Sequence, residues 1–245
     1  MKKPILISVV VPAYNEEKYL GRCLSALKKQ TLPKSSYEII VVNNHSTDKT
    51  GLIGKKAGVK VVFEKKKGYV FALRAGCSQA QGKIIAITDA DALVPPDWLE
   101  KIFQAYQADP GVVGVGGRTI HQPRFLLAIL VEAFYNFGGW LFKSSPGFNL
   151  SVRKDAYQRI GGFRKEINFD TDLDLCLRLK RAGKMVFLWN NPVVASSRRF
   201  QSPGRAAYCF KALINIMALI LFGKAVFFEF GEIRTAISGK GGKNS

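Results

Sequence analysis

Short apolar segments alternate with helical patterns through roughly the first 90 residues, and this alternation constrains the fold most strongly. The expected strands are residues 5–11, 37–42, 59–63 and 83–88, and residues 112–117 are expected to form another. Their apolar, β-branched character is typical of parallel strands covered on both faces. Between the first two, Leu20, Cys23, Leu24 and Leu27 recur at helical spacing, in a helix that Asn15 is expected to cap. The order predicts an α/β domain with a mostly parallel central sheet flanked by helices.

Polar clusters follow three of the expected strands. These clusters are residues 12–16, 43–48 and 89–91. Ligands of parallel sheets bind beyond the carboxyl ends of the strands, where all three clusters fall. The sequence therefore predicts a binding site at this edge of the sheet.

The composition favours an intracellular protein with anionic partners. The chain has 245 residues, 47% of them hydrophobic, and a formal net charge of +19. Such a charge attracts nucleic acid, phosphate-bearing small molecules or an acidic membrane surface. The four isolated cysteines, which indicate a reducing compartment, are Cys23, Cys77, Cys176 and Cys209. With no signal peptide and no apolar run long enough to span a bilayer, a cytoplasmic location is expected.

The segment "ITDADALVPPDW" places Asp89 and Asp91 directly after the fourth expected strand. Alone, two aspartates around one alanine are more often part of a structural turn. Pro95 and Pro96 prevent a direct continuation into a helix, so both carboxylates can approach one ligand. Carboxylate oxygens suit Mg²⁺ or Mn²⁺, and the position at a strand end favours a metal site over a plain turn.

A second acidic group consists of Asp170, Asp172 and Asp174. A calcium loop does not fit, because Leu175 stands where that loop needs glycine and Arg181 where it needs glutamate. Acidic residues also favour the first turn of a helix, here expected over residues 172–182. A well-capped amphipathic helix and a general base at the mouth of the site both remain open.

The basic segment "EKKKGY" has two interpretations. Such a run is usually a solvated surface, but Lys67 and Gly68 are also placed to border a bound diphosphate. His45 and His121 have no partner at metal-ligand spacing, so we interpret both as structural.

Five segments in order resemble the family 2 glycosyltransferases of the GT-A fold. They are "VVVPAYNEEKYL", "YEIIVVNNHSTDKTG", "KGYVFALRAG" with "AQGKIIAITDADALVPPDWL", "GFNLSVRKDAYQRIGGF" and "TDLDLCLRLKRAGK". The resemblance covers roughly residues 5–200 and implies a glycosyltransferase domain at residues 1–200. Residues 201–245 are then a separate apolar and basic helical region.

The resemblance implies a site for a nucleotide-diphosphate sugar across the strand ends. The donor-binding residues that it implies are Pro12, Tyr14, Glu16, Asn43, Ser46, Lys67, Gly68, Arg74, Asp89 and Arg199. Of these, Asn43 would face the base, and Arg199 in "SSRRF" would reach the donor phosphates or the acceptor. Many relatives carry aspartate at the position of Asn43, which leaves the base (UDP-, GDP- or dTDP-linked) open.

The resemblance also implies a metal-dependent hexosyl transfer. Asp91, together with Asp89, would hold Mg²⁺ or Mn²⁺, which neutralises charge on the leaving nucleoside diphosphate. Asp172 would accept the proton of an acceptor hydroxyl in a single displacement with inversion. Thr171 replaces the glutamate that usually precedes this base. Transfer to a polyprenyl phosphate is the alternative, and it would need no base.

The C-terminal region suggests a membrane surface. Residues 212–223 carry no charge and are apolar on both helical faces, yet they are too few to span a bilayer. Basic residues flank them, as in helices that lie on anionic lipid. We expect a peripheral enzyme at the inner face of the membrane, with residues 124–143 as a second contact and a lipid-linked or cell-envelope glycan as acceptor. A homodimer interface is the alternative.

Three other functions are less favoured. A nucleic-acid-binding protein would suit the charge, but zinc-ligand spacing, a basic recognition helix and an RNP-like signature are missing from the sequence. A Rossmann dehydrogenase needs a glycine fingerprint where "VPAYNEE" stands. A nucleotidyltransferase would need a glycine-rich basic loop after the first strand.

Overall fold

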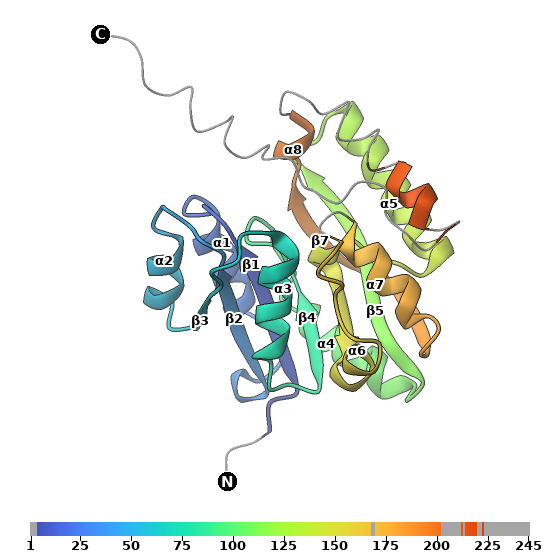
Figure 1. Cartoon of the computed structure of the whole chain (residues 1–245), viewed down its shortest axis with the longest axis horizontal. Coiled ribbons are helices and arrows are strands. Elements are labelled where there is room, and N and C mark those ends of the chain that lie inside the picture. Colours follow the sequence, from blue (N-terminus) through green and yellow to red (C-terminus); the bar gives the residue numbers. More distant parts are fainter. Residues whose placement is uncertain (1–3, 168–169, 202–211, 213, 220–221, 223–245) are drawn as a thin grey trace.

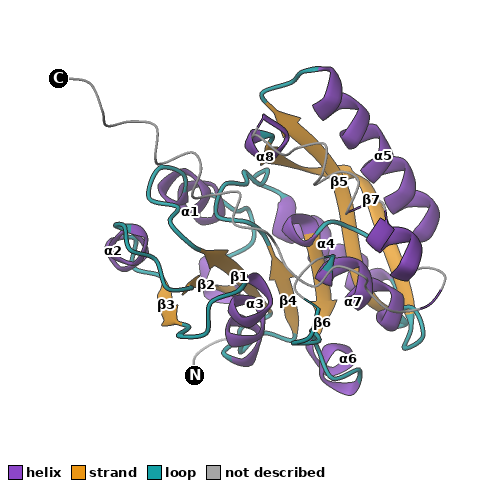
Figure 2. Cartoon of the chain, turned by 45° about the horizontal axis from the view of Figure 1, so that its top comes forward, coloured by secondary structure: helices purple, strands orange, loops and turns teal. Residues whose placement is uncertain are grey.

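A single mixed sheet forms the centre of the fold. The computed structural model describes residues 4–167, 170–201, 212, 214–219 and 222. The strands are β1 (Ile7–Ala13), β2 (Tyr37–Asn43), β3 (Lys60–Phe63), β4 (Ile84–Ile87), β5 (Val112–Gln122), β6 (Leu150–Arg153) and β7 (Lys184–Ser196). The helices are α1 (Leu20–Lys28), α2 (Thr50–Lys56), α3 (Tyr69–Ser78), α4 (Trp98–Ala108), α5 (Leu126–Phe142), α6 (Lys154–Arg159), α7 (Thr171–Leu179) and α8 (Arg198–Gln201). Figures 1 and 2 show helices on both faces of the sheet, which confirms the expected α/β fold.

The sheet runs in the order β3-β2-β1-β4-β6-β5-β7. Strands β3, β2, β1 and β4 pair in parallel, β6 is antiparallel to both neighbours, and β7 is parallel to β5. Six of the seven strands therefore end at the same edge, where the polar clusters lie. Strands β6 and β7 have no counterpart among the strands predicted from the sequence.

The two faces of β1 bury apolar side chains against different helices. Val9 and Val11 pack in the cluster that contains the buried residues of α1 and α4, whereas Val10 packs with those of α3 and α7. Gly76 brings α3 close to the sheet, because a Cβ atom at this position would overlap the side chain of Val10. Burial on both faces explains the uniformly apolar sequence of this strand.

The prediction that Asn15 caps the first helix is wrong. Helix α1 begins only at Leu20, and Asn15 has a left-handed φ of 53°. Its Oδ1 atom accepts a hydrogen bond from the backbone N–H of Thr47, at 2.8 Å, and so joins the loops after β1 and β2. By contrast, α7 carries Asp172 and Asp174 in its first turn, as expected.

The described part of the C-terminal region packs on the domain. Residues 212, 214–219 and 222 are helical, and the other residues after 201 lie outside the described part of the chain, Cys209 among them. Leu219 is buried with Ile167 against Leu173 and Leu177 of α7. Among the described residues, no helix is both long and apolar enough to cross a membrane. The prediction of a membrane-bound or dimerising tail stays a prediction.

Candidate active site

Two acidic side chains from different loops converge on one guanidinium group. Arg198, at the start of α8, donates from Nη2 to Glu16 Oε1 at 2.5 Å and lies 3.0 Å from Asp91 Oδ2. The guanidinium also lies over the ring of Tyr19, 4.6 Å from its centroid. The Glu16 side chain is 2% exposed and that of Asp91 13%. The carboxylates of Glu16 and Asp91 therefore form a partly buried site for positive charge.

Asp89 faces a different partner from Asp91. Its Oδ1 atom accepts a hydrogen bond from the hydroxyl of Tyr69, the first residue of α3, at 3.0 Å. Burial, followed by the negative charges of Asp89 and Asp172, raises the pKa of Tyr69 well above its ordinary value. The hydroxyl therefore stays protonated and can act as a donor throughout the neutral range.

The proposed base, Asp172, is held rigidly by backbone groups. Its Oδ2 atom accepts from the N–H of Gly147 at 2.7 Å, and its Oδ1 atom accepts from the N–H of Leu173 at 3.0 Å. Burial raises the pKa of this carboxyl, while these hydrogen bonds and the charge of Arg199 oppose the rise. A Cβ atom at Gly147 would lie 3.1 Å from the Tyr69 hydroxyl and 3.8 Å from Asp172 Oδ2. The Tyr69 hydroxyl therefore lies near both Asp89 and Asp172.

Asp170 is a second acidic residue close to Asp172. Burial, followed by the charge of Asp172, raises its pKa to about 8, although a hydrogen bond to Asn215 and the charge of Arg199 act in the opposite direction. Asp170 is therefore mostly protonated at neutral pH. The contact also ties the described part of the C-terminal region to the site.

Residues expected to surround the nucleotide come together at the ends of β1 and β2. Asn43 Oδ1 accepts from the N–H of Ser46 at 3.0 Å, and the Ser46 hydroxyl accepts from the N–H of Asn15 at 3.0 Å. The Lys67 ammonium lies over the ring of Tyr14, 5.3 Å from its centroid. Pro12 is buried in β1 beside these loops.

The loop that carries Gly68 is fixed by Asn44, a residue that the sequence analysis did not single out. Asn44 Oδ1 accepts from the N–H of Gly68 at 2.8 Å, and its Nδ2 donates to the carbonyl of Lys66 at 2.7 Å. Gly68 has a φ of 139°, which favours glycine. The signal was present in the sequence as the second asparagine of "NNHST", directly after an expected strand.

The two arginines that are expected to bind the donor have different surroundings. Arg74 donates to the carbonyl of Phe163, in the loop after α6, and its role at the donor stays a prediction. Arg199 lies close enough to Tyr69 and Asp172 for its charge to lower both pKa values. The contact with Asp91 comes from its neighbour Arg198, which the sequence analysis did not select.

The acidic residues fit a divalent cation held together with a substrate. Within the described ranges, no group of three or more His, Cys, Asp or Glu side chains is arranged so that it could hold a metal ion by itself. Mg²⁺, however, usually binds one or two carboxylates together with water and substrate phosphates. Asp91 already contacts one cationic group, and Asp89 leads into the same turn, so both fit such a site.

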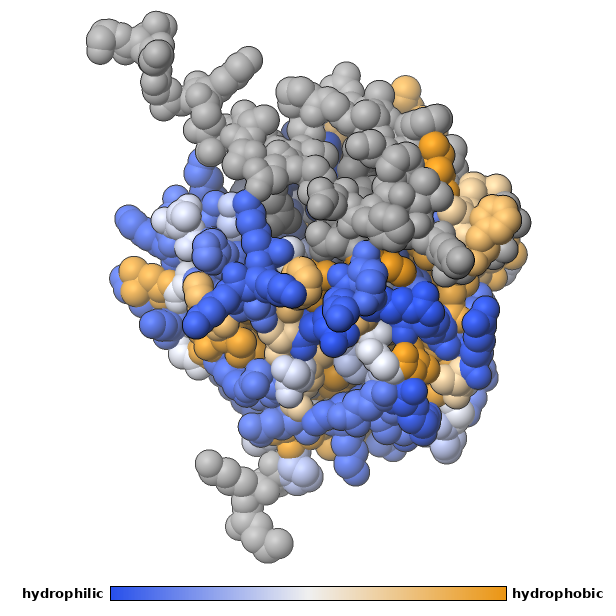
Figure 3. All heavy atoms as spheres, in the orientation of Figure 1, coloured by the Kyte–Doolittle hydropathy of each residue, from blue (hydrophilic) through white to orange (hydrophobic). Residues whose placement is uncertain are grey.

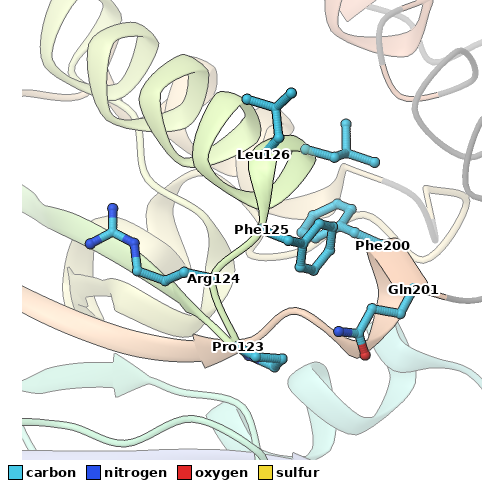
Figure 4. A pocket seen from close by; sticks show the side chains of 7 residues that line it. Pro123, Arg124, Phe125, Leu126, Phe200 and Gln201 are labelled. Carbon is cyan, nitrogen blue, oxygen red and sulfur yellow. The ribbon is translucent and has the colours of Figure 1, made fainter.

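An apolar pocket lies at the N-terminal end of α5, next to the arginines of α8 (Figure 4). Its volume is about 610 Å³, and it is lined by Pro123, Arg124, Phe125, Leu126, Leu127, Phe200 and Gln201. Phe200 directly follows Arg199, so the pocket adjoins the acidic cluster through α8. It differs in character from the polar strand ends that are expected to bind the donor.

Comparison with known families decides the classification. The sequence profile described as glycosyl transferase family 2 matches residues 8–166, which is more than half of the chain. The chain belongs to glycosyl transferase family 2. This family 2 protein is 30% identical over 211 residues to a dolichyl N-acetyl-α-D-glucosaminyl phosphate 3-β-D-2,3-diacetamido-2,3-dideoxy-β-D-glucuronosyltransferase of Methanococcus voltae, covering 78% of this chain and 66% of the relative. It is also 30% identical to the glycosyltransferase AglE of Haloferax volcanii, covering 72% of this chain and 62% of the relative. It thus spans less than two thirds of the length of these relatives.

Solved structures confirm that this family 2 protein has the GT-A fold. The mannosyltransferase PcManGT from Pyrobaculum calidifontis, in complex with GDP-Man and Mn²⁺, is similar with a TM-score of 0.71 and 24% identity over 91% of this chain and 68% of that one. The S. aureus protein TarS 1-349, in complex with UDP-GlcNAc, has a TM-score of 0.71 and 18% identity over the same shares of the two chains.

Proposed function

We propose that the protein is an inverting glycosyltransferase that moves a hexosyl group from a nucleotide-diphosphate sugar to an acceptor hydroxyl. The observation that carries this proposal is that Asp91 and Asp172 have different surroundings. Asp91 contacts the guanidinium of Arg198, whereas Asp172 accepts a hydrogen bond from the N–H of Gly147 and does not share that cation in any contact of the described residues. One acid is thus suited to the leaving group and the other to the acceptor.

In the proposed reaction, Asp172 removes the proton of the acceptor hydroxyl as its oxygen attacks the anomeric carbon. The raised pKa of Asp172 makes it a better proton acceptor than an exposed aspartate, and general-base catalysis of this kind contributes about 10²- to 10⁴-fold. The N–H of Gly147 orients the carboxylate. A divalent ion, held by Asp91 and Asp89, would supply Lewis-acid stabilisation of the departing diphosphate.

The relatives support the substrate classes. Two neighbours in structure are complexes with UDP-GlcNAc and with GDP-Man and Mn²⁺. The name of the Methanococcus voltae relative describes a dolichyl-phosphate-linked sugar as acceptor. We therefore propose a UDP-, GDP- or dTDP-linked donor and a lipid-linked or cell-envelope glycan acceptor at the cytoplasmic face of an anionic membrane. Transfer to a polyprenyl phosphate is the alternative acceptor chemistry.

A donor panel tests the proposal. UDP-, GDP- and dTDP-sugars are tested with Mg²⁺ or Mn²⁺ for thermal stabilisation of the protein and for release of nucleoside diphosphate. We expect one donor to stabilise the protein and to be hydrolysed slowly. Asp172→Asn should keep the stabilisation and lose transfer to a hydroxyl acceptor, whereas Asp155→Asn, on the exposed face of α6, should retain both. If no donor stabilises the protein and none releases nucleoside diphosphate, the proposal is contradicted.

Undiminished transfer by Asp172→Asn would favour a phosphate acceptor. Strong salt-dependent binding of DNA, without turnover of any donor, would favour a nucleic-acid-binding protein instead.

A further inference from the structure

Helix α5 has its polar side towards the protein and its apolar side towards solvent. The residues that it buries are Ala128, Glu132, Asn136 and Gly139. Its opposite side consists of Leu126, Leu130, Phe134, Phe137, Trp140 and Leu141, between 43% and 73% exposed, which we name the apolar face of α5. Helices of water-soluble proteins normally have the reverse arrangement.

Hydrogen bonds to the backbone of β5 fix this orientation. Glu132 Oε2 accepts from the N–H of His121 at 3.0 Å. Asn136 accepts from the N–H of Thr119 at 2.8 Å and donates to its carbonyl at 2.9 Å. Turning α5 to bury its apolar side would break these bonds and leave buried polar groups unsatisfied. The apolar face is therefore held outward by the fold.

Basic residues stand at both ends of the apolar face. Arg124 precedes α5 and is 54% exposed, and Lys143 follows the helix with its ammonium 5.4 Å from the centre of the Trp140 ring. Glu132 is the only acidic residue between positions 123 and 147, and it is buried. In Figure 3 hydrophobic side chains gather at the right-hand edge, where the C-terminal end of α5 lies. An apolar, aromatic centre with a basic border matches an anionic lipid surface.

We propose that the apolar face of α5 lies on an anionic lipid surface, at the depth of the headgroups and the first part of the acyl chains. The formal charge of +19 on each chain favours lipid over a second copy, because two such copies repel each other. Leu126 belongs both to this face and to the lining of the pocket beside α8, so the pocket adjoins the proposed lipid surface. The inference refines the membrane part of the proposed function and rests on it.

Vesicle sedimentation of the full chain tests the inference. The probes are vesicles of phosphatidylglycerol with phosphatidylcholine, and vesicles of phosphatidylcholine alone. The variant Leu130→Gln/Phe137→Gln replaces two exposed side chains of the face with a good helix former. The control is Leu52→Gln, in which a leucine of α2 that is 48% exposed receives the same change.

The wild type and the control should sediment with anionic vesicles and much less with neutral ones. The partition coefficient of the double variant into anionic vesicles should be about 100-fold lower than that of wild type. This corresponds to tenfold, or about 1.4 kcal/mol, for each replaced side chain. Wild-type protein that stays in the supernatant, or a double variant that sediments like wild type, would overturn the inference. Sedimentation velocity shows whether the face binds a second copy instead. A wild type that sediments as a dimer, together with a double variant that sediments as a monomer, would assign the face to a second copy.

Donor hydrolysis without vesicles separates this inference from the proposed function. Turnover by a protein that does not bind vesicles overturns the docking surface alone. Vesicle binding that the double variant loses, by a protein that turns over no donor, supports the docking surface and contradicts the proposed chemistry.

Discussion

Asp170→Asn should make the stability of the protein less dependent on pH. The pKa of the Asp170 carboxyl rises from 3.8 to about 8 in the folded protein, chiefly through burial and then through the charge of Asp172. A carboxyl group with a raised folded-state pKa stabilises the protein at low pH, and this contribution is lost as pH rises towards 8. With 1.36 kcal/mol for each pH unit, the free energy of unfolding should fall by about 4 kcal/mol between pH 5 and pH 8 through this group. Asparagine is uncharged and tolerates the left-handed φ of 53° at this position.

Urea unfolding at pH 5, 6, 7 and 8 measures this effect. The free energy of unfolding of Asp170→Asn, relative to wild type, should rise by about 4 kcal/mol across this range. Asp155→Asn is the control, because Asp155 is 59% exposed on α6, and its difference from wild type should stay nearly constant. Asp172→Asn should weaken the pH dependence of the wild type, because it removes the second cause of the shift. A pH-independent difference between Asp170→Asn and wild type would show that folding does not raise the pKa of Asp170.

Two further substitutions test the arrangement around the acids. Tyr69→Phe removes the hydroxyl that donates to Asp89, and a hydrogen bond to a charged group is worth about 1.5–3 kcal/mol. In steady-state assays, kcat at saturating donor should therefore fall about ten- to hundredfold. An unchanged kcat would show that this hydrogen bond does not contribute to turnover. Arg198→Gln removes the cation that Glu16 and Asp91 share. In urea titrations at pH 7, the free energy of unfolding should fall by about 3 kcal/mol, because two carboxylates lose their partner. A free energy of unfolding equal to that of wild type would show that the ion pairs contribute little.

The parallel half of the fold could be predicted because its strands are apolar on both faces. In β1 to β4 the sequence period and the flanking polar clusters agree with the structure. In contrast, β6 reads "LSVR", in which only two of the four residues are apolar, and β7 contains "WNNP" in its middle. Neither shows the apolar run that marks β1 to β4. Their places in the sheet come from pairing with β4 and β5, which a local sequence window does not contain.

The positions of the acidic residues could be predicted, but the side chains that contact them could not. Asp89, Asp91 and Asp172 follow recognisable patterns, whereas Tyr69 reaches Asp89 only because α3 begins beside the end of β4. The choice between Arg198 and Arg199 depends on the direction of two successive side chains in α8, which the sequence does not encode locally.

The reversed polarity of α5 leaves a weak trace in the sequence. Glu132 and Asn136 stand four residues apart within an otherwise apolar segment, and both turn towards β5. The segment was expected to be a membrane contact from its aromatic content alone. The structure adds which side of the helix faces outward.

In the proposed reaction, Asp91 helps to hold a cation that draws negative charge from the departing nucleotide. Calorimetric titration of UDP and GDP into the protein, with and without Mn²⁺, measures this role. We expect Mn²⁺ to tighten nucleotide binding to wild type and to the exposed control Asp97→Asn, and we expect this gain to disappear in Asp91→Asn. An equal gain from Mn²⁺ in Asp91→Asn and wild type would show that Asp91 does not hold the cation.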